Sequence, residues 1–229
     1  MVMRKEVEVG IYVPTGENPD LAIQTYRDGL SERISLSGER SKQNPVIVHD
    51  ACELFDGIDD GKFDFGFLQV RRNGNVPTEV IGMWVLDYQE IAVVAEQPVW
   101  SLDKSFGAGC FHLISNAYHI THTDHQNKAA ICFVPKSKKP GALQAIIRHL
   151  KNAEAEVTWS ETLSLGKAGE VNYLEFRRTG NLWRPEVLDT IDNLTKNVFK
   201  FGMYQHWNQL LNVEPSKVGR TTPAMVPAN

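Results

Sequence analysis

Hydrophobic and polar positions alternate along the first hundred residues in a pattern that predicts strands and helices in turn. Asn18 and Pro19 are a suitable N-cap and first residue for one helix, and Asp50 with Glu53 begins a second. Apolar runs of strand length lie at 8–13, 45–50, 63–70, 81–86 and 90–100. This alternation predicts an N-terminal α/β layer.

The second half of the chain shows a different and more regular order. Strand patterns at 128–135, 156–165, 170–178 and 197–204 are interrupted by amphipathic helix patterns at 140–153 and 184–196. The order βαββαβ predicts a ferredoxin-like unit, with a four-stranded antiparallel sheet and both helices on one face. We therefore divide the chain into an α/β domain (1–105), a connecting segment (106–127), a ferredoxin-like domain (128–205) and a C-terminal tail (206–229).

Composition and charge exclude several classes of function. The chain has 229 residues, of which 42% are hydrophobic and 23% charged, and its net charge is −4. This balance predicts no nucleic-acid partner and no anionic membrane surface. No apolar run approaches the roughly 18 residues of a membrane helix, and the N-terminus does not read as a signal peptide. Three cysteines without CxxC spacing indicate reduced thiols and a cytoplasmic protein.

A run of histidines is the most conspicuous local pattern. His119, His122 and His125, with Asp124, have a spacing that a metal site uses, provided that the segment is helical. The segment lacks a cap and an amphipathic face, so the sequence favours a polar loop over a metal site or a histidine-mediated contact between subunits. We predict neither a metal nor a cofactor.

Cys110 and His112 form a second candidate pair. A cysteine beside a histidine has the composition of a nucleophile with its base. Most free cysteines are buried and inert, and the sequence favours that interpretation for Cys110. We therefore assign no catalytic residue from the sequence.

The stretch KKPGALQAIIRHLKNAEAEVTWSETLS (138–164) resembles the regulatory ACT domain of prephenate dehydratases. Gly141-Ala142-Leu143 matches the family's first effector motif at a helix start, and Glu161 matches the beginning of the second. The resemblance implies an amino-acid effector, such as phenylalanine, bound between this turn and Glu161. It also implies a homodimer formed through the ACT helices or a sheet edge.

The N-terminal half resembles one lobe of the same enzymes in the stretches VGIYVPTGENPDLAI and DACELFDGIDDGKFDFGFLQV. Arg71-Arg72-Asn73 replaces the family's Glu-Asn-Ser motif, and Gly109-Cys110-Phe111 replaces its Thr-Arg-Phe motif. The family's second lobe is missing. The implied fold class is α/β, with one prephenate-dehydratase-like lobe followed by a ferredoxin-like ACT domain.

Two functional hypotheses follow from this resemblance. The first is a divergent carbon–oxygen lyase that acts on a prephenate-like or other aromatic or cyclohexadienyl acid, in a secondary-metabolite pathway of the tropone or tropodithietic acid type. Its pocket would lie between Pro14-Thr15-Gly16 and Arg71-Arg72-Asn73, because guanidinium groups bind carboxylates in a bidentate manner. A solvated arginine pair is the competing interpretation. The second hypothesis is a non-catalytic regulatory protein whose ACT domain binds phenylalanine or a related amino acid.

Overall fold

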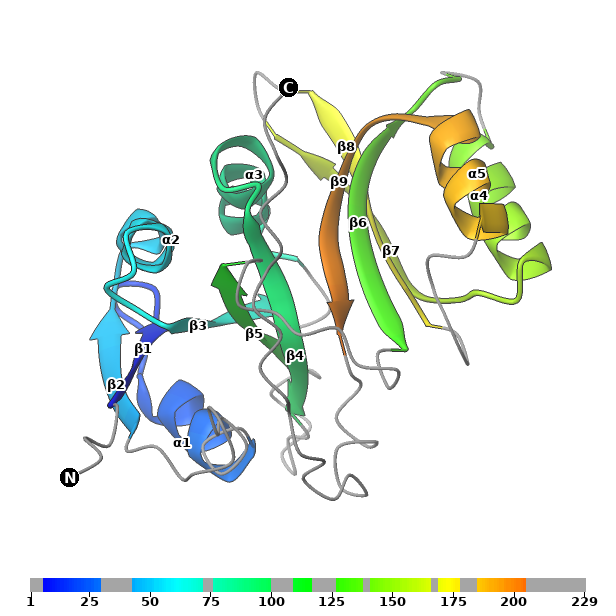
Figure 1. Ribbon diagram of the computed structural model, residues 1–229. Helices are drawn as coiled ribbons and strands as arrows, with labels where there is room; N and C mark the ends of the chain where they lie inside the picture. Colours follow the sequence, from blue (N-terminus) through cyan, green and yellow to red (C-terminus); the bar gives the residue numbers. More distant parts are fainter. Residues whose placement is uncertain are drawn as a thin grey trace, which may run out of the picture.

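A computed structural model shows a chain built from two β-sheets that pack against each other (Figure 1). It describes residues 6–29, 43–71, 76–99, 109–116, 127–137, 141–165, 169–177 and 185–204. The first sheet and its helices comprise β1 (Val7–Tyr12), α1 (Asp20–Gly29), β2 (Gln43–Val48), α2 (Ala51–Asp59), β3 (Phe65–Arg71), α3 (Thr78–Asp87), β4 (Ile91–Val99) and β5 (Gly109–Asn116). The second comprises β6 (Lys128–Pro135), α4 (Ala142–Asn152), β7 (Glu156–Ser164), β8 (Glu170–Arg177), α5 (Pro185–Leu194) and β9 (Thr195–Tyr204).

The first sheet has the strand order β2-β1-β3-β5-β4. Its first three strands are parallel, whereas β5 runs antiparallel to both β3 and β4. Helix α1 covers one face, where Tyr26 packs against Phe67 and Phe111, and helices α2 and α3 cover the other. Residues 100–108 alone join β4 to β5, which is too short a connection for a second α/β lobe.

The second sheet has the order β7-β8-β6-β9 and is antiparallel throughout. Helices α4 and α5 pack together on one face, as Figure 1 shows, and the opposite face meets the first sheet where β4 packs on β9. The βαββαβ order of the second half and the mixed α/β fold class are confirmed. The predicted domain limits remain a prediction, although residues 109–116 of the predicted connecting segment form β5 of the first sheet.

Two features of the N-terminal layer differ from the sequence prediction. Residues 81–86 belong to helix α3 and not to a strand, because a short continuous apolar run does not distinguish a buried helix from a buried strand. The apolar run at 45–50 is typical of a buried strand, but β2 is an edge strand in which only Val48 is fully buried. Its edge position also explains why Pro45 is tolerated within it.

Some predicted features lie outside the described residues. These are the histidine segment, the tip of the turn that joins β7 to β8, and the C-terminal tail. Among the residues that the structure describes, no helix is long and apolar enough to cross a membrane.

Helix α3 adds a packing contact between its own layer and the second sheet, beside the contact of β4 with β9. The fully buried Trp84 donates a hydrogen bond from Nε1 to the carbonyl oxygen of Ile91 at 2.8 Å. Its ring meets Phe201 of β9 edge-on, with centroids 4.7 Å apart. On the same helix Gly82 leaves room for Leu165, whose Cδ2 would lie only 3.1 Å from an added Cβ. Trp84 therefore joins the two sheets through one side chain.

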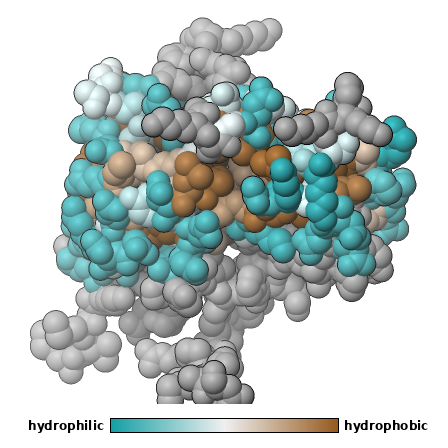
Figure 2. Space-filling view, turned by 90° about the horizontal axis from the view of Figure 1, so that it is seen from above, coloured by the Kyte–Doolittle hydropathy of each residue, from teal (hydrophilic) through white to brown (hydrophobic). Residues whose placement is uncertain are grey.

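The face above α3 is partly apolar. Seen from above, hydrophobic side chains gather near its middle with hydrophilic ones around them (Figure 2). A shallow hollow of about 350 Å³ lies between α3 and the end of β7, and Met83, Leu86 and Leu165 are among the residues that line it. Leu86 is 54% exposed, so it contributes little to the core.

We predict that Trp84→Ala lowers the free energy of unfolding by about 3–5 kcal/mol, because it removes a large buried side chain and leaves a cavity between the sheets. Urea unfolding followed by circular dichroism measures the change. Leu86→Ala, on the exposed side of the same helix, is the matched control and should cost less than about 0.5 kcal/mol. Equal losses in the two variants would contradict the assigned role of Trp84.

Candidate functional site

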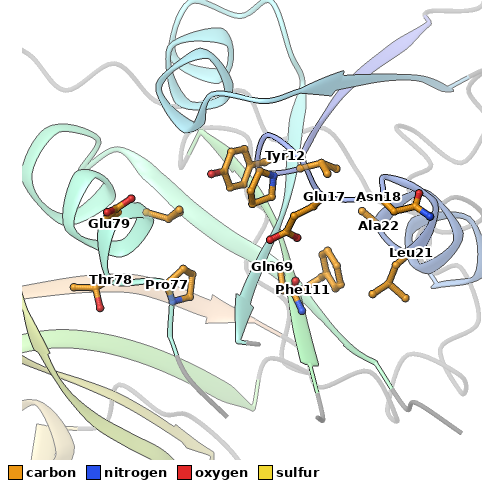
Figure 3. A pocket seen from close by; sticks show the side chains of 13 residues that line it. Tyr12, Glu17, Asn18, Leu21, Ala22, Gln69, Pro77, Thr78, Glu79 and Phe111 are labelled. Carbon is orange, nitrogen blue, oxygen red and sulfur yellow. The ribbon is translucent and has the colours of Figure 1, made fainter. Parts of the chain in front are cut away.

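A cavity of about 440 Å³ opens at the carboxyl ends of β1 and β3, beside the start of α1. This is the end of parallel strands at which open α/β sheets bind ligands, and the volume suits a small organic molecule. Figure 3 shows the side chains around it. The lining residues are Tyr12, Val13, Pro14, Glu17, Asn18, Leu21, Ala22, Gln69, Pro77, Thr78, Glu79, Val80 and Phe111.

The predicted substrate-binding residues divide into three groups. Pro14 lines the cavity, and Thr15 and Gly16 lie exposed in the same turn, in which the Glu17 N–H donates to the Pro14 carbonyl oxygen at 3.0 Å. Gly16 has φ +88°, a conformation that favours glycine. Arg71 does not line the cavity. Arg72 and Asn73 lie outside the described residues.

A β-bulge explains why Arg71 faces away from the cavity. Gln69 pairs with Phe111, and Arg71 pairs with the adjacent residue Cys110, so the register shifts by one residue between Gln69 and Arg71. Strict alternation would have placed Arg71 on the same face as Gln69, which lines the cavity. The extra residue turns Arg71 to the opposite face, towards the second sheet.

The charges that line the cavity are negative. Glu17 and Glu79 are carboxylates, and the described lining residues include no lysine, arginine or histidine. Burial raises the pKa of the Tyr12 hydroxyl, and the nearby carboxylates of Asp50, Glu17 and Glu79 raise it further. Tyr12 therefore remains a neutral hydroxyl at neutral pH. Asn18 Oδ1 accepts from the Asp20 N–H at 2.9 Å, so this backbone donor at the start of α1 is already satisfied.

Arg71 instead belongs to a cluster of charges buried between the two sheets. The cluster pairs Arg71 and Lys128 with Glu96 and Glu175. Lys128 Nζ contacts Glu96 Oε2 directly and lies 2.9 Å from Glu175 Oε2. Arg71 Nη2 lies 3.8 Å from Glu96 Oε1 and 3.5 Å from Glu175 Oε2. The two carboxylates thus share two cations, and the four charges balance.

Neighbouring aromatic groups complete the inter-sheet cluster. Tyr173 donates from its hydroxyl to Glu175 Oε1 at 2.7 Å, and the Arg71 guanidinium lies 5.0 Å from the centre of the Trp159 ring. Sequence reasoning missed this cluster. The available signal was a charged residue in the interior of a largely apolar strand pattern, such as Glu96 in EIAVVAEQPVW and Glu175 in EVNYLEFRR.

The pKa shifts follow from this pairing. Burial alone would raise the pKa of Glu96, but the neighbouring His112 and Lys128 outweigh it and hold the pKa below the ordinary value. Burial alone would lower the pKa of Lys128, but Glu175 and Glu96 outweigh it and raise the pKa. Both groups are therefore charged at neutral pH, which makes the cluster a buried ion pair network.

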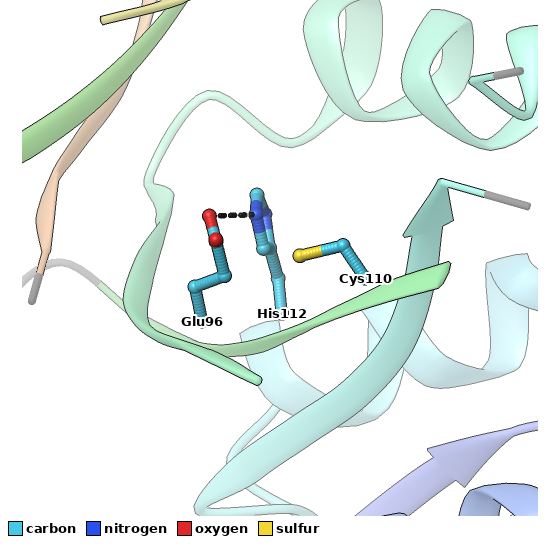
Figure 4. A group of neighbouring side chains, drawn as sticks. All are labelled: Glu96, Cys110 and His112. Atoms are coloured by element: carbon cyan, nitrogen blue, oxygen red, sulfur yellow. Dashed lines mark ion pairs between the residues drawn. The ribbon is translucent and has the colours of Figure 1, made fainter. Parts of the chain in front are cut away.

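Glu96, Cys110 and His112 lie side by side at the edge of this cluster (Figure 4). Their donor atoms are all within 4.8 Å of one another, and His112 Nε2 lies 3.7 Å from Glu96 Oε2. These are donor types that bind zinc. However, Lys128 and Arg71 already neutralise the Glu96 carboxylate, so a divalent cation would lie beside two fixed positive charges. The donor set therefore fits an ion pair better than a metal.

The same geometry bears on Cys110 as a nucleophile. Cys110 and His112 are each 1% exposed, so a substrate has no path to the thiol. Burial raises the pKa of the Cys110 thiol well above its ordinary value, and the carboxylates of Glu96 and Glu175 act in the same direction. A protonated, enclosed thiol is a poor nucleophile.

A second cavity, of about 690 Å³, lies at the start of α4. The predicted effector residues Gly141, Ala142 and Leu143 line it, and Gly141 has φ +86°. The fourth predicted effector residue, Glu161, does not line this cavity. The residues that line it are Val134, Pro135, Ser137, Gly141, Ala142, Leu143, Gln144, Thr162, Glu170 and Asn172.

Strand alternation explains the position of Glu161. Successive side chains of β7 point to opposite faces, so Glu161 faces the first sheet while Thr162 faces the helices. Glu161 Oε2 accepts from the Val76 N–H at 3.2 Å and from Trp159 Nε1 at 3.3 Å. In its place Thr162 reaches the second cavity, with its hydroxyl 3.0 Å from Asn172 Oδ1.

Comparison with known proteins assigns the chain to a structural class. No protein-family model matches the sequence, and no curated protein matches it. Solved structures do match, and prephenate dehydratases are prominent among them. The chain therefore has a prephenate-dehydratase-like fold.

Three particular structures illustrate this likeness. The prephenate dehydratase of Staphylococcus aureus has a TM-score of 0.63 at 10% identity, with 87% of this chain and all of that chain covered. The enzyme of Arthrobacter aurescens in complex with L-Phe has a TM-score of 0.60 at 11% identity, with coverages of 89% and 91%. GqqA, described as a novel type of quorum quenching acylase, has a TM-score of 0.60 at 16% identity, with coverages of 86% and 94%. At these identities the likeness is one of fold.

We predict that Lys128→Met costs about 3–5 kcal/mol of unfolding free energy, because it leaves Glu96 and Glu175 buried with only Arg71 to compensate them. Chemical unfolding measures the loss, and the double variant Lys128→Met with Glu96→Gln should recover part of it.

The exposed pair of Lys62 and Glu53 provides the matched control for this experiment. Its atoms are 3.3 Å apart, and its side chains are 57% and 51% exposed. Lys62→Met should cost less than about 1 kcal/mol. Comparable losses for Lys62→Met and Lys128→Met would show that burial does not govern the inter-sheet cluster.

Proposed function

We propose that this protein binds a small aromatic or cyclohexadienyl acid in the first cavity, as a divergent relative of prephenate dehydratases. The observation that carries this proposal is the cavity itself, which has a suitable size and lies at the carboxyl ends of β1 and β3. Its walls combine apolar side chains such as Leu21 and Phe111 with the hydroxyl of Thr78 and the amide of Gln69. Such a combination suits an aromatic ring that carries polar substituents.

The carboxylate of the proposed ligand needs a positive charge or N–H donors in the protein. Arg71 is committed to the inter-sheet cluster, so Arg72 remains the proposed guanidinium partner from the predicted pair. The backbone N–H groups of Thr15 and Gly16, in the Pro14-Thr15-Gly16 turn, are the other proposed donors. A carbon–oxygen lyase reaction would also need a proton donor, and the hydroxyls of Tyr12 and Thr78 are the neutral donors that line the cavity. The secondary-metabolite pathway and the lyase chemistry are finer parts of the same proposal.

The regulatory alternative rests on a separate observation. The second cavity contains the Gly141-Ala142-Leu143 turn that the ACT resemblance singles out, with Thr162 and Asn172 on its opposite wall. A structural neighbour, the Arthrobacter enzyme, has L-Phe bound. Under this alternative an amino acid would bind in the second cavity of a homodimer, and the first cavity would have no catalytic role.

We expect phenylacetate, phenylpyruvate or prephenate to raise the melting temperature of the wild type. A ligand at about 100 times its Kd stabilises the folded state by about 2.7 kcal/mol. Thr78→Val and Arg72→Ala should each weaken this binding about tenfold or more, as loss of a hydrogen bond or charge in the cavity requires. Formation of phenylpyruvate from prephenate in the same samples separates a lyase from a binding protein. If no aromatic acid stabilises the wild type, the proposal is wrong.

Threonine residues in the two cavities allow a reciprocal test of the alternative. Thr162→Val should weaken phenylalanine binding about tenfold if the second cavity is the amino-acid site, and it should leave aromatic-acid binding unchanged. Calorimetry with both variants and both ligands gives four affinities. Weakening of phenylalanine binding by Thr78→Val alone would exclude the second cavity as the amino-acid site.

A further inference from the structure

We infer that Glu161 is a positioning residue of the first cavity, although it belongs to the second sheet. Its role is to hold the start of α3, which forms one wall of that cavity, in the position that a ligand needs. This inference rests on the proposed function and deepens it, because it concerns the binding of a ligand in the same cavity. The resemblance to the ACT domain implies an effector role for Glu161, but its hydrogen bonds lead towards the first cavity.

One wall of the first cavity is the beginning of helix α3. Residues 77–80 line the cavity from this side. Figure 3 shows Pro77 and Thr78 on the opposite side of the cavity from Leu21 of α1. A ligand in the cavity would contact both sides, so a shift in the start of α3 would change how well the two sides fit it.

Helix α3 begins without a side-chain cap. Its N-cap residue is Pro77, whose side chain cannot accept a hydrogen bond from the first turn. Serine, threonine, aspartate or asparagine at this position would hold the chain locally. The position of this wall therefore depends on contacts from outside the helix.

Glu161 provides such a contact from β7. Its Oε2 accepts from the N–H of Val76, the residue directly before the N-cap, at 3.2 Å. Val76 is only 4% exposed, and a buried N–H that loses its partner is costly. Without the Glu161 carboxylate, the segment would recover part of that cost by moving its N–H towards water. The hydrogen bond thus ties the wall of the cavity to the second sheet.

The carboxylate of Glu161 is itself held in place. Trp159 lies two residues earlier on the same face of β7, and its Nε1 donates to the same carboxylate oxygen at 3.3 Å. The Trp159 ring in turn packs against the guanidinium of Arg71 in the inter-sheet cluster. Further along α3, Trp84 meets Phe201 of the second sheet. The second sheet therefore contacts α3 in its middle and the chain just before its start.

Removal of the Glu161 carboxylate tests the inference, with phenylacetate, phenylpyruvate and prephenate as probes. In Glu161→Ala only a fraction of the molecules would keep the wall in its binding position, so isothermal titration should show about tenfold weaker binding of these acids. Glu161→Gln retains an oxygen that can accept from the Val76 N–H, and it should bind nearly as well as the wild type. Amide hydrogen exchange followed by NMR should be faster at Val76 in Glu161→Ala than in Glu161→Gln.

Two controls separate positioning from other roles. Leu150 is fully buried between the second sheet and its helices, on the face away from the first sheet. Leu150→Ala should lower the melting temperature and leave the affinity for the acids unchanged wherever the variant is folded. Phenylalanine reports on the second cavity, which Thr162 lines and Glu161 does not, so its affinity should be unchanged in Glu161→Ala.

The inference is overturned if Glu161→Ala binds the acids as tightly as the wild type, or if Leu150→Ala weakens their binding equally. It is also overturned if Glu161→Ala weakens the binding of phenylalanine alone, which would return Glu161 to the effector site. In each of these cases, binding of an acid by the wild type still supports the proposed function.

Two further outcomes complete the test. If Glu161→Ala does not fold, Trp159→Phe removes the second donor to the carboxylate and should still weaken binding of the acids, and unchanged binding in that variant overturns the inference. If none of the acids binds the wild type, the proposed function is overturned and the inference falls with it.

Discussion

The packing of one sheet on the other depends on charges that neither sheet could bury alone. Glu96 and Arg71 come from the first sheet, and Lys128 and Glu175 come from the second, and all four are largely removed from water. An unpaired carboxylate or ammonium in such a place would cost several kcal/mol, so the charges are tolerable only while the sheets stay in register. This requirement restricts the relative position of the sheets, in addition to the close packing of Trp84 against Phe201.

The inter-sheet cluster also connects the two cavities through continuous strands. Strand β3 carries Gln69 at the first cavity and Arg71 in the cluster, and strand β8 carries Asn172 at the second cavity and Glu175 in the cluster. A displacement of either strand would therefore change ion-pair distances between the sheets. A ligand would produce such a displacement only if it bound the displaced arrangement of the strands more tightly than the present one.

Much of the fold could be predicted from the sequence, because it depends on periodicities that are local. The βαββαβ order of the second half follows from strand-length apolar stretches such as KAAICFVP and from a 3.6-residue period in its helices. The errors have specific physical causes. Residues 81–86 were assigned as a strand because an uninterrupted apolar run satisfies both periods, and only the tertiary contacts of α3 decide between them.

The candidate site could be predicted in position but not in composition. Parallel strands and a tight turn indicate where the cavity lies, and Pro14 does line it. The face that Arg71 adopts depends on a bulge that no single-strand pattern reveals, and the face of Glu161 depends on the pairing of β7. The two carboxylates that line the cavity, Glu17 and Glu79, come from segments that are far apart in the sequence, so only the folded chain brings them together.

The short connection from β4 to β5 bears on how the first cavity would select its ligand. A site between two hinged lobes can admit a molecule loosely and then test it as the lobes close, so recognition takes place in two stages. In this chain β4 and β5 are adjacent antiparallel strands joined by residues 100–108, and no second lobe follows between them. If the proposed ligand binds in the first cavity, its discrimination would then depend on groups that are already in place, and its residence time would reflect those contacts rather than the opening of a hinge.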